Sequence, residues 1–243
     1  MIEAKDIHKS FGAVKALRGV SFEAPDELVT GLLGPNGAGK STTLRVLYTL
    51  LRPDRGTATV DGHDVVQQPL DVRSRIGVLP HNAGLYPRLT ARENIRFFGR
   101  LNGLRDATLD RNTERVIKLL DIGAFADRKA KGFSQGQRIK VALGRAMVHE
   151  PRNILLDEPT NGLDVMATRS LRALILRLRD EGKCVLFSSH VMQEVAALCD
   201  EIVIIGSGRV VASGTPAAIR ADTGESSLED AFVKAIGSDE GLE

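Results

Sequence analysis

Between positions 34 and 42, glycines, a lysine and hydroxyls stand at a spacing that suits phosphate chemistry. Gly34 to Ser41 match the pattern G-x-x-x-x-G-K-[ST] at every fixed position. Glycines let the backbone curl around phosphates with its N–H groups turned inward, where a Cβ would collide. In such a loop the lysine reaches the β- and γ-phosphates and the hydroxyl coordinates Mg²⁺. The predicted triphosphate site comprises Gly34, Pro35, Asn36, Gly37, Ala38, Gly39, Lys40, Ser41 and Thr42.

The flanks of this loop carry the two elements that the motif requires. Residues 29–33 are apolar enough for a short buried strand, and residues 40–50 show leucines at helical spacing. The helix N-terminus would add favourable partial positive charge toward a phosphate. The alternative, a glycine-rich turn before an ordinary helix, does not account for the complete match.

A second apolar run, residues 153–157, ends in two carboxylates. Asp157 is placed to hold the Mg²⁺ shell, and Glu158 to polarise an attacking water. Phosphoryl transfer needs little beyond such positioning and charge compensation. The structural alternative is a strand end that leads into a turn at Pro159.

Further motifs follow in a fixed order: Phe133-Ser134-Gln135-Gly136-Gln137, Leu155-Leu156-Asp157-Glu158-Pro159, Asn161-Gly162-Leu163-Asp164 and Ser188-Ser189-His190. With the phosphate loop, this order resembles an ABC-transporter ATPase from about Ile2 to Val211. The resemblance implies that Ser134, Gly136 and Gln137 belong to a signature sequence that completes the ATP site of a partner in a head-to-tail dimer. It implies that Asp164 links the two sites and that His190 contacts the γ-phosphate. Glu158, Lys40 and His190 are thus the expected catalytic residues.

Phe11 resembles the aromatic residue that stacks on adenine in this family. It follows a predicted strand over residues 2–7 and precedes Gly12. Stacking on an aromatic face is worth about 1–3 kcal/mol per base. Packing in the core is the alternative role, and the sequence does not decide between the two.

Two positions depart from the usual family pattern. His81 stands where a glutamine is expected to touch the metal–water shell, and a neutral imidazole can ligate a metal or bond a water. We hypothesise that His81 keeps this role for nucleotide and metal but makes it pH-sensitive; alternatively, a backbone group acts there. Gln135 replaces the common glycine of the signature and leaves Ser134 and Gly136 in place.

Composition sets limits on the class of protein. A chain of 243 residues with 42% hydrophobic content can bury one large α/β domain, and a net charge of +2 is too slight to indicate nucleic acid. The polar N-terminus shows no signal peptide, and no apolar run approaches the roughly 18 residues of a membrane span. We therefore expect a soluble, cytoplasmic protein whose two cysteines, Cys184 and Cys199, are buried and reduced.

The expected fold is an α/β P-loop NTPase core of the RecA-like type, with an antiparallel β layer and an inserted helical subdomain, as in ABC ATPases. One domain spans residues 1–243: residues 1–81 and 151–214 form the core and β layer, 82–150 the helical subdomain, and 215–243 a short tail. Thr90 and Glu93 predict a capping box for a helix to Leu101. Further expected helices cover residues 109–120, 137–147, 165–181 and 228–236, and strands cover 184–188, 202–205 and 209–212.

Arg92, Arg96 and Arg100 share one face of the helix that begins after Thr90. They predict either a solvated surface or a dock for an acidic loop or anionic lipid. Tyr86 and Leu89 either add an apolar patch beside them, where the resemblance implies a contact with the membrane subunit, or belong to the core of the helical subdomain.

The expected function is that of an ATP-hydrolysing ABC-transporter subunit that dimerises around ATP–Mg²⁺, with itself or a related subunit. It would act on the cytoplasmic membrane face through a separate integral permease. Its short tail favours export, and residues 149–166 and 188–194 resemble the sodium-export branch of the ABC-2 ATPases. Drugs, lipid or polysaccharide are alternative cargoes, and a soluble ABC ATPase on ribosomes or DNA is an alternative class. An ordinary P-loop kinase or GTPase is not expected, because the sequence has no Asn-Lys-x-Asp motif for guanine recognition and such proteins have no use for residues 134–137.

Overall fold

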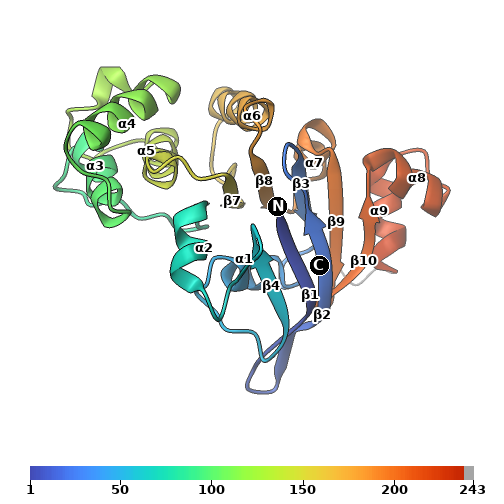
Figure 1. Cartoon of the computed structure of the whole chain (residues 1–243). Coiled ribbons are helices and arrows are strands. Elements are labelled where there is room, and N and C mark those ends of the chain that lie inside the picture. Colours follow the sequence, from blue (N-terminus) through green and yellow to red (C-terminus); the bar gives the residue numbers. More distant parts are fainter. Residues whose placement is uncertain (238–243) are drawn as a thin grey trace.

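The computed structural model describes residues 1–237, in which a small antiparallel sheet packs beside a larger, mainly parallel one (Figure 1). The small sheet has the order β2-β1-β4-β5, from β1 (Ile2–Phe11), β2 (Val14–Ala24), β4 (Arg55–Val60) and β5 (His63–Asp64). Ile2 pairs with Ala24 on one side and with Val60 on the other, and all three are buried. This sheet confirms the expected antiparallel layer.

The larger sheet has the order β10-β9-β3-β8-β7-β6. Its strands are β3 (Val29–Leu33), β6 (Ile76–Leu79), β7 (Asn153–Asp157), β8 (Cys184–Ser189), β9 (Glu201–Gly206) and the antiparallel edge strand β10 (Arg209–Gly214). Every residue of β3, β7 and β8 is buried, as in sheets covered on both faces. Because these strands are parallel, their carboxyl ends meet at one edge, where ligands bind in open α/β sheets.

Apolar cores cover both faces of this sheet. Leu32 and Leu155 belong to the core shared with α1 (Lys40–Leu47) and the antiparallel sheet. Leu33 and Leu156, the next residues along each strand, belong to the core on the opposite face. Helices α6 (Val165–Asp180) and α7 (Met192–Leu198) pack into that second core. Successive side chains of each strand therefore point to opposite faces of the sheet, and each face packs against its own set of helices.

Between β6 and β7 the chain forms a group of helices set apart from the small sheet (Figure 1). The group comprises α3 (Ala91–Leu101), α4 (Asp106–Leu119), a 3₁₀ turn (Gly123–Phe125) and α5 (Gln135–Met147). Thr90 caps α3 through the predicted box: its hydroxyl accepts from Glu93 N, and its own N–H donates to the Glu93 carboxylate.

Two of the arginines on one face of α3 form ion pairs within this group of helices. Arg92 forms ion pairs with Glu114 and Asp127, and Arg96 pairs with Asp110. These ion pairs tie α3 to α4 and to the segment after the 3₁₀ turn, so the charges of Arg92 and Arg96 are already partnered, while the predicted dock on this face stays a prediction.

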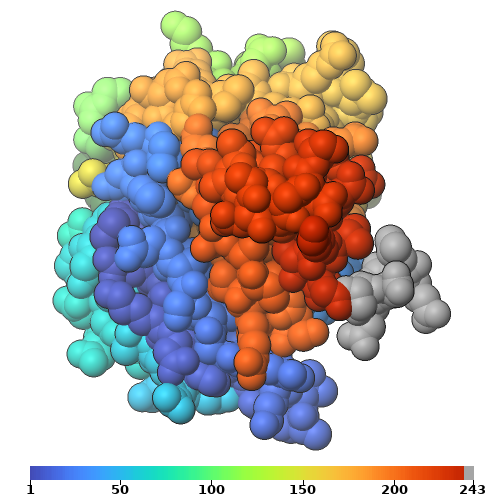
Figure 2. Space-filling model, turned by 90° about the vertical axis from the view of Figure 1, so that its right-hand side faces the viewer, coloured from blue at the N-terminus to red at the C-terminus, as the bar shows by residue number. Residues whose placement is uncertain are grey.

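Other elements differ in extent from the expectation. Helix α1 ends at Leu47 instead of Leu50, whose side chain is exposed. Two short helices were not predicted: α2 (Pro69–Arg75) and α8 (Pro216–Thr223). Helix α9 (Leu228–Ile236) has the predicted bounds, and Figure 2 shows the C-terminal segment in orange and red on one face, beside the N-terminal strands in blue. The part of the expected tail beyond residue 237 lies outside the described residues.

Both cysteines are free and buried, as predicted. Cys184 begins β8, and burial raises the pKa of its thiol to about 12. The Cys199 sulfur fills the space that a side chain at Gly31 would need. Burial raises the pKa of the Cys199 thiol as well. Within residues 1–237, no helix is long and apolar enough to cross a bilayer.

Candidate active site

The phosphate loop joins the carboxyl end of β3 to α1, as predicted, along a path that glycine alone can follow. Gly39 has φ +111°, and a Cβ there would lie 2.8 Å from both the Ala16 carbonyl oxygen and Leu17 Cδ2. A Cβ on Gly34 would collide with the Ile205 carbonyl oxygen. No side chain caps the start of α1, so its first N–H groups stay available to an anion.

Lys40 folds back over this loop. Its Nζ donates hydrogen bonds to the carbonyl oxygens of Gly34 (2.7 Å) and Pro35 (3.0 Å) and lies 3.9 Å from Glu158 Oε1. Burial lowers the pKa of Lys40, although the nearby carboxylates of Glu158 and Asp157 oppose this shift. An anion in the loop would add to the negative charge that Glu158 and Asp157 already place near this buried cation.

Asp157 is the acidic end of β7 and is almost fully buried. Its Oδ1 accepts hydrogen bonds from Ser41 Oγ (3.0 Å) and from Ser188 Oγ (2.7 Å). Its Oδ2 is buried with no hydrogen-bond partner within the described part of the chain. Mg²⁺ is a hard cation that prefers oxygen ligands, and this unpartnered carboxylate oxygen lies beside the hydroxyl of Ser41. The residues present therefore fit the predicted metal.

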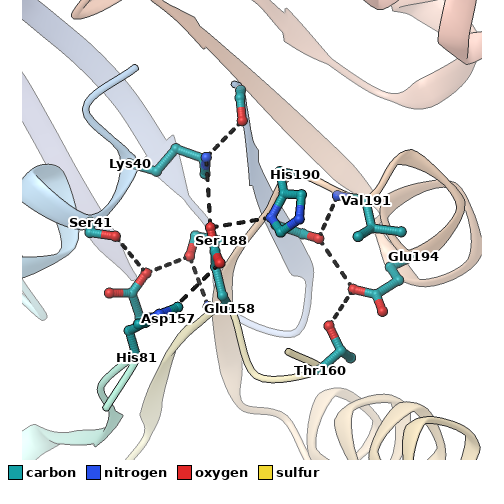
Figure 3. A network of polar contacts seen from close by, with 12 residues as sticks. Lys40, Ser41, His81, Asp157, Glu158, Thr160, Ser188, His190, Val191 and Glu194 are labelled. Carbon is teal, nitrogen blue, oxygen red and sulfur yellow. Dashed lines mark hydrogen bonds and ion pairs between the residues drawn. The ribbon is translucent and has the colours of Figure 1, made fainter. Parts of the chain in front are cut away.

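Glu158, the residue after Asp157, has a positive φ angle, and several nitrogen-bearing side chains lie close to its carboxylate. Its φ is +48°, a conformation that costs energy for a non-glycine residue and is held here by hydrogen bonds from its N–H to Ser188 O (3.2 Å) and Oγ (3.0 Å). His190 Nδ1 lies 3.3 Å from Oε1, and His81 Nδ1 lies 3.6 Å from Oε2. Lys40 approaches the same carboxylate, so three nitrogen-bearing side chains surround it (Figure 3).

A hollow of about 450 Å³ opens in front of these groups. It is lined by Asn36, Ser41, Arg45, His81, Glu158, Asn161 and His190. Four segments far apart in the sequence thus converge there, and four of the lining side chains carry charge or titrate. Sequence reasoning missed Arg45, although it lies one helical turn after Ser41 and so shares its face of α1.

The predicted signature residues form the start of α5. Ser134 caps the helix: its Oγ accepts from Gln137 N (3.3 Å), and its N–H donates to Gln137 Oε1 (3.1 Å). Ser134 and Gln135 are exposed, and a Cβ at Gly136 would lie 3.5 Å from the Ala167 Cβ. Ser134, Gly136 and Gln137 are not among the residues that line the 450 Å³ hollow in the described chain.

Asp164 caps α6 by accepting a hydrogen bond from Ala167 N (2.8 Å). The next two side chains, Val165 and Met166, are 69% and 68% exposed. Two exposed apolar side chains therefore follow the capped turn. This turn contains Gly162, which lies beside Gln135 of the signature segment.

Phe11 is the last residue of β1 and is 47% exposed. Lys9 Nζ lies 5.8 Å from the centre of that ring. Phe11 is therefore not part of the buried core, and stacking on a base stays a prediction.

Sequence reasoning also missed a buried group of polar side chains behind the hollow. Glu194 in α7 accepts hydrogen bonds from Thr160 and Ser189. Figure 3 shows Glu194 and Thr160 on the side of His190 away from Asp157. No local pattern marks the bond from Thr160 to Glu194, because it joins positions 34 residues apart.

Comparison with known proteins agrees with this geometry. The family model described as "ABC transporter" matches residues 17–161, more than half of the chain. The chain is similar to the ABC transporter ATP-binding protein NatA of Bacillus subtilis (strain 168), with 48% identity over 83% of this chain and 82% of the relative. It is 40% identical to the daunorubicin/doxorubicin resistance ATP-binding protein DrrA of Streptomyces peucetius, over 93% of this chain and 69% of DrrA.

A solved structure has the same fold. The dimeric structure of MJ0796, a bacterial ABC transporter cassette, matches with a TM-score of 0.80 and 26% identity, covering 88% of this chain and 98% of that one. The same cassette is also known in a dimeric post-hydrolysis state bound to ADP and Pi. With the phosphate loop, the paired carboxylates and the fold in agreement, the chain belongs to the ABC transporter family as an ATP-binding, ATP-hydrolysing domain.

Proposed function

We propose that two copies of this chain, or this chain and a related subunit, close on two ATP molecules and drive export through a separate membrane permease. One observation carries the proposal: the capped N-terminus of α5 presents Ser134 to solvent, outside the hollow that holds the phosphate loop. A helix N-terminus favours an anion, so a second copy can use this end to cover its neighbour's phosphates. The exposed Val165 and Met166 would be buried by such a closure.

Each predicted site residue has a role in this proposal. Lys40 and the loop residues from Gly34 to Thr42 bind the phosphates, and Phe11 stacks on the adenine. Ser41 and Asp157, with His81 close by, hold Mg²⁺, which when bound neutralises charge on the β- and γ-phosphates. Glu158 orients the attacking water, and His190 contacts the γ-phosphate while it holds the Glu158 carboxylate. Gly136, Gln137 and Asp164 act at the interface between the two copies.

The protein would lie on the cytoplasmic face of the membrane through its permease. Export is supported by the similarity to the Nod factor export ATP-binding protein I of Burkholderia lata, which is 36% identical over 90% of this chain. Sodium efflux is proposed on the resemblance of residues 149–166 and 188–194 to the sodium-export branch of this family. Drug, lipid or polysaccharide export is the second candidate, favoured by the 40% identity to DrrA.

Purification of the native complex tests this function. The complex should contain a polytopic membrane subunit, and sealed vesicles that hold it should move sodium when ATP is supplied. A complex with Glu158→Gln is the matched control, since it keeps the assembly but loses hydrolysis. ATP-driven movement of a drug without sodium would select the second candidate, and co-sedimentation with ribosomes or DNA in place of a permease would contradict the proposal.

A further inference from the structure

A buried carboxylate lies behind the site and takes no part in the roles assigned above. Glu194 in the first turn of α7 is 6% exposed. Its Oε2 accepts hydrogen bonds from Thr160 Oγ1 (2.6 Å) and Ser189 Oγ (3.2 Å). Among residues 1–237, no lysine, arginine or histidine forms an ion pair with Glu194, so the two hydroxyls stabilise its charge.

The first hydroxyl belongs to the turn that leaves Glu158. Thr160 O accepts from Leu163 N (3.0 Å), and Asn161 N donates to Glu158 O (3.2 Å). These bonds make the turn one unit between Glu158 and the Asp164 cap of α6. A hydrogen bond from the Thr160 side chain to Glu194 therefore anchors the whole turn to α7.

The second hydroxyl belongs to the segment that carries His190. Ser189 Oγ donates to Glu194 and accepts from Val191 N (2.9 Å), so the residues on both sides of His190 are fixed through one oxygen. The imidazole of His190 stays 45% exposed, with Nδ1 3.3 Å from Glu158 Oε1. The backbone of His190 is thus held from behind while its ring faces the hollow (Figure 3).

We propose that Glu194 is a positioning residue for ATP hydrolysis. By binding Thr160 and Ser189 at one oxygen, it fixes the spacing between the turn after β7, which carries Glu158, and the segment after β8, which carries His190. The inference deepens the proposed function, because it concerns the hydrolysis step that would open the closed dimer. The phosphate loop lies between β3 and α1 and Lys40 begins α1, so most of the contacts proposed for the nucleotide lie outside this hydrogen-bonded unit.

Thr160→Val tests the proposal in the full-length chain, because valine keeps the shape of threonine and removes the hydroxyl donor. We expect kcat for ATP to fall about tenfold, as the loss of one hydrogen bond to a charged group allows. KM for ATP and the number of ATP molecules bound should stay within twofold. Thr160→Ser restores the hydroxyl and should return kcat to within threefold of the parent.

A double-mutant cycle separates positioning from folding. Glu194→Gln keeps the shape of Glu194 but weakens both hydrogen bonds, and its effect on kcat should be less than additive with that of Thr160→Val, since both variants weaken the Thr160–Glu194 contact. Thr223→Val is the matched control: Thr223 Oγ1 bonds Ile219 O (2.8 Å) in α8, away from the hollow, and kcat should not change.

Several outcomes overturn the inference. They are an unchanged kcat in Thr160→Val, additive effects in the cycle, an equal loss in Thr160→Ser, or a loss of kcat that merely follows a loss of folded protein seen by circular dichroism. None of these outcomes would contradict the proposed ATP-driven closure, because that proposal is tested separately by dimerisation of the Glu158→Gln variant.

Discussion

His190 Nδ1 lies 3.3 Å from Glu158 Oε1, so the segment after β8 meets the residue after β7 at the mouth of the hollow. The contact joins two strands that are neighbours in the sheet but 32 positions apart at these residues. Glu158 also has φ +48°, so the hydrogen bonds of its N–H to Ser188 hold its backbone in a conformation that non-glycine residues rarely adopt.

Glu158→Gln is expected to abolish turnover while ATP binding continues. An amide cannot accept a proton from water, and loss of a general base lowers kcat by roughly 10²- to 10⁴-fold. The variant should be a dimer in saturating ATP with Mg²⁺, measured by light scattering after size-exclusion chromatography. Glu181→Gln, on the surface at the end of α6, is the control and should leave turnover unchanged. A strictly monomeric Glu158→Gln under these conditions would argue against the proposed closure.

Lys40→Met should weaken ATP binding without loss of fold. Methionine keeps the methylene stem in its buried position, while the charge that reaches phosphate is removed. A hydrogen bond to a charged group is worth about 1.5–3 kcal/mol, which corresponds to roughly 10- to 150-fold in Kd. Calorimetric titration with ATP measures the change, and Lys234→Met serves as the surface control. An unchanged Kd would remove Lys40 from the proposed site.

Phe11→Ala should weaken the binding of ATP but not of inorganic tripolyphosphate. Stacking on a base contributes about 1–3 kcal/mol, or roughly 5- to 150-fold in Kd, and tripolyphosphate has no base to stack. Because the ring is exposed, the thermal unfolding midpoint should stay near that of the parent. Val14→Ala, at a neighbouring exposed position, is the control. Equal weakening of both ligands by Phe11→Ala would contradict the stacking role.

His149 should make the protein less stable in acid. Burial lowers the pKa of His149, with Lys183 adding to the effect, and its Nδ1 is buried without a hydrogen-bond partner among the described residues. The unfolded chain takes up this proton near the ordinary pKa of about 6.5. The unfolded state therefore binds more protons just below that pH, and the free energy of unfolding must fall as the pH drops through it.

The variant His149→Gln tests whether His149 causes this loss of stability in acid. Glutamine can still donate a hydrogen bond to Ile76 O, which His149 Nε2 contacts at 3.0 Å, but it does not titrate. Urea unfolding of both proteins at pH 7.5 and pH 5 should show a smaller acid-induced loss of stability in the variant. Equal losses in both proteins would exclude His149 as the source.

Local chemistry explains what the sequence could predict. The Thr90–Glu93 spacing indicates a capping box, and both of its hydrogen bonds are present. The phosphate loop lies between its predicted strand and helix, because each element is marked within about ten residues. Helix α8 also had such a signal, since Thr215 caps it and Pro216 occupies its first turn, but this pattern was overlooked.

Contacts between distant segments explain what the sequence could not predict. The partners of Arg92 and Arg96 depend on how α3 packs against α4, which charge spacing along one helix does not reveal. The bond from Thr160 to Glu194 depends on the order β8-β7 in the sheet. Helix α2 has seven residues, and its Leu70 is exposed, so no amphipathic pattern marks it.

The burial of both sulfur atoms has a practical consequence for fluorescence work. The chain has two cysteines, and since thiolates are the reactive form, thiols with pKa values raised by burial resist maleimide reagents in the folded protein. A single cysteine introduced on the surface, such as Asp222→Cys on α8, would then accept a dye selectively. Energy transfer between two labelled copies can report their approach in real time, with both native sulfurs left in place.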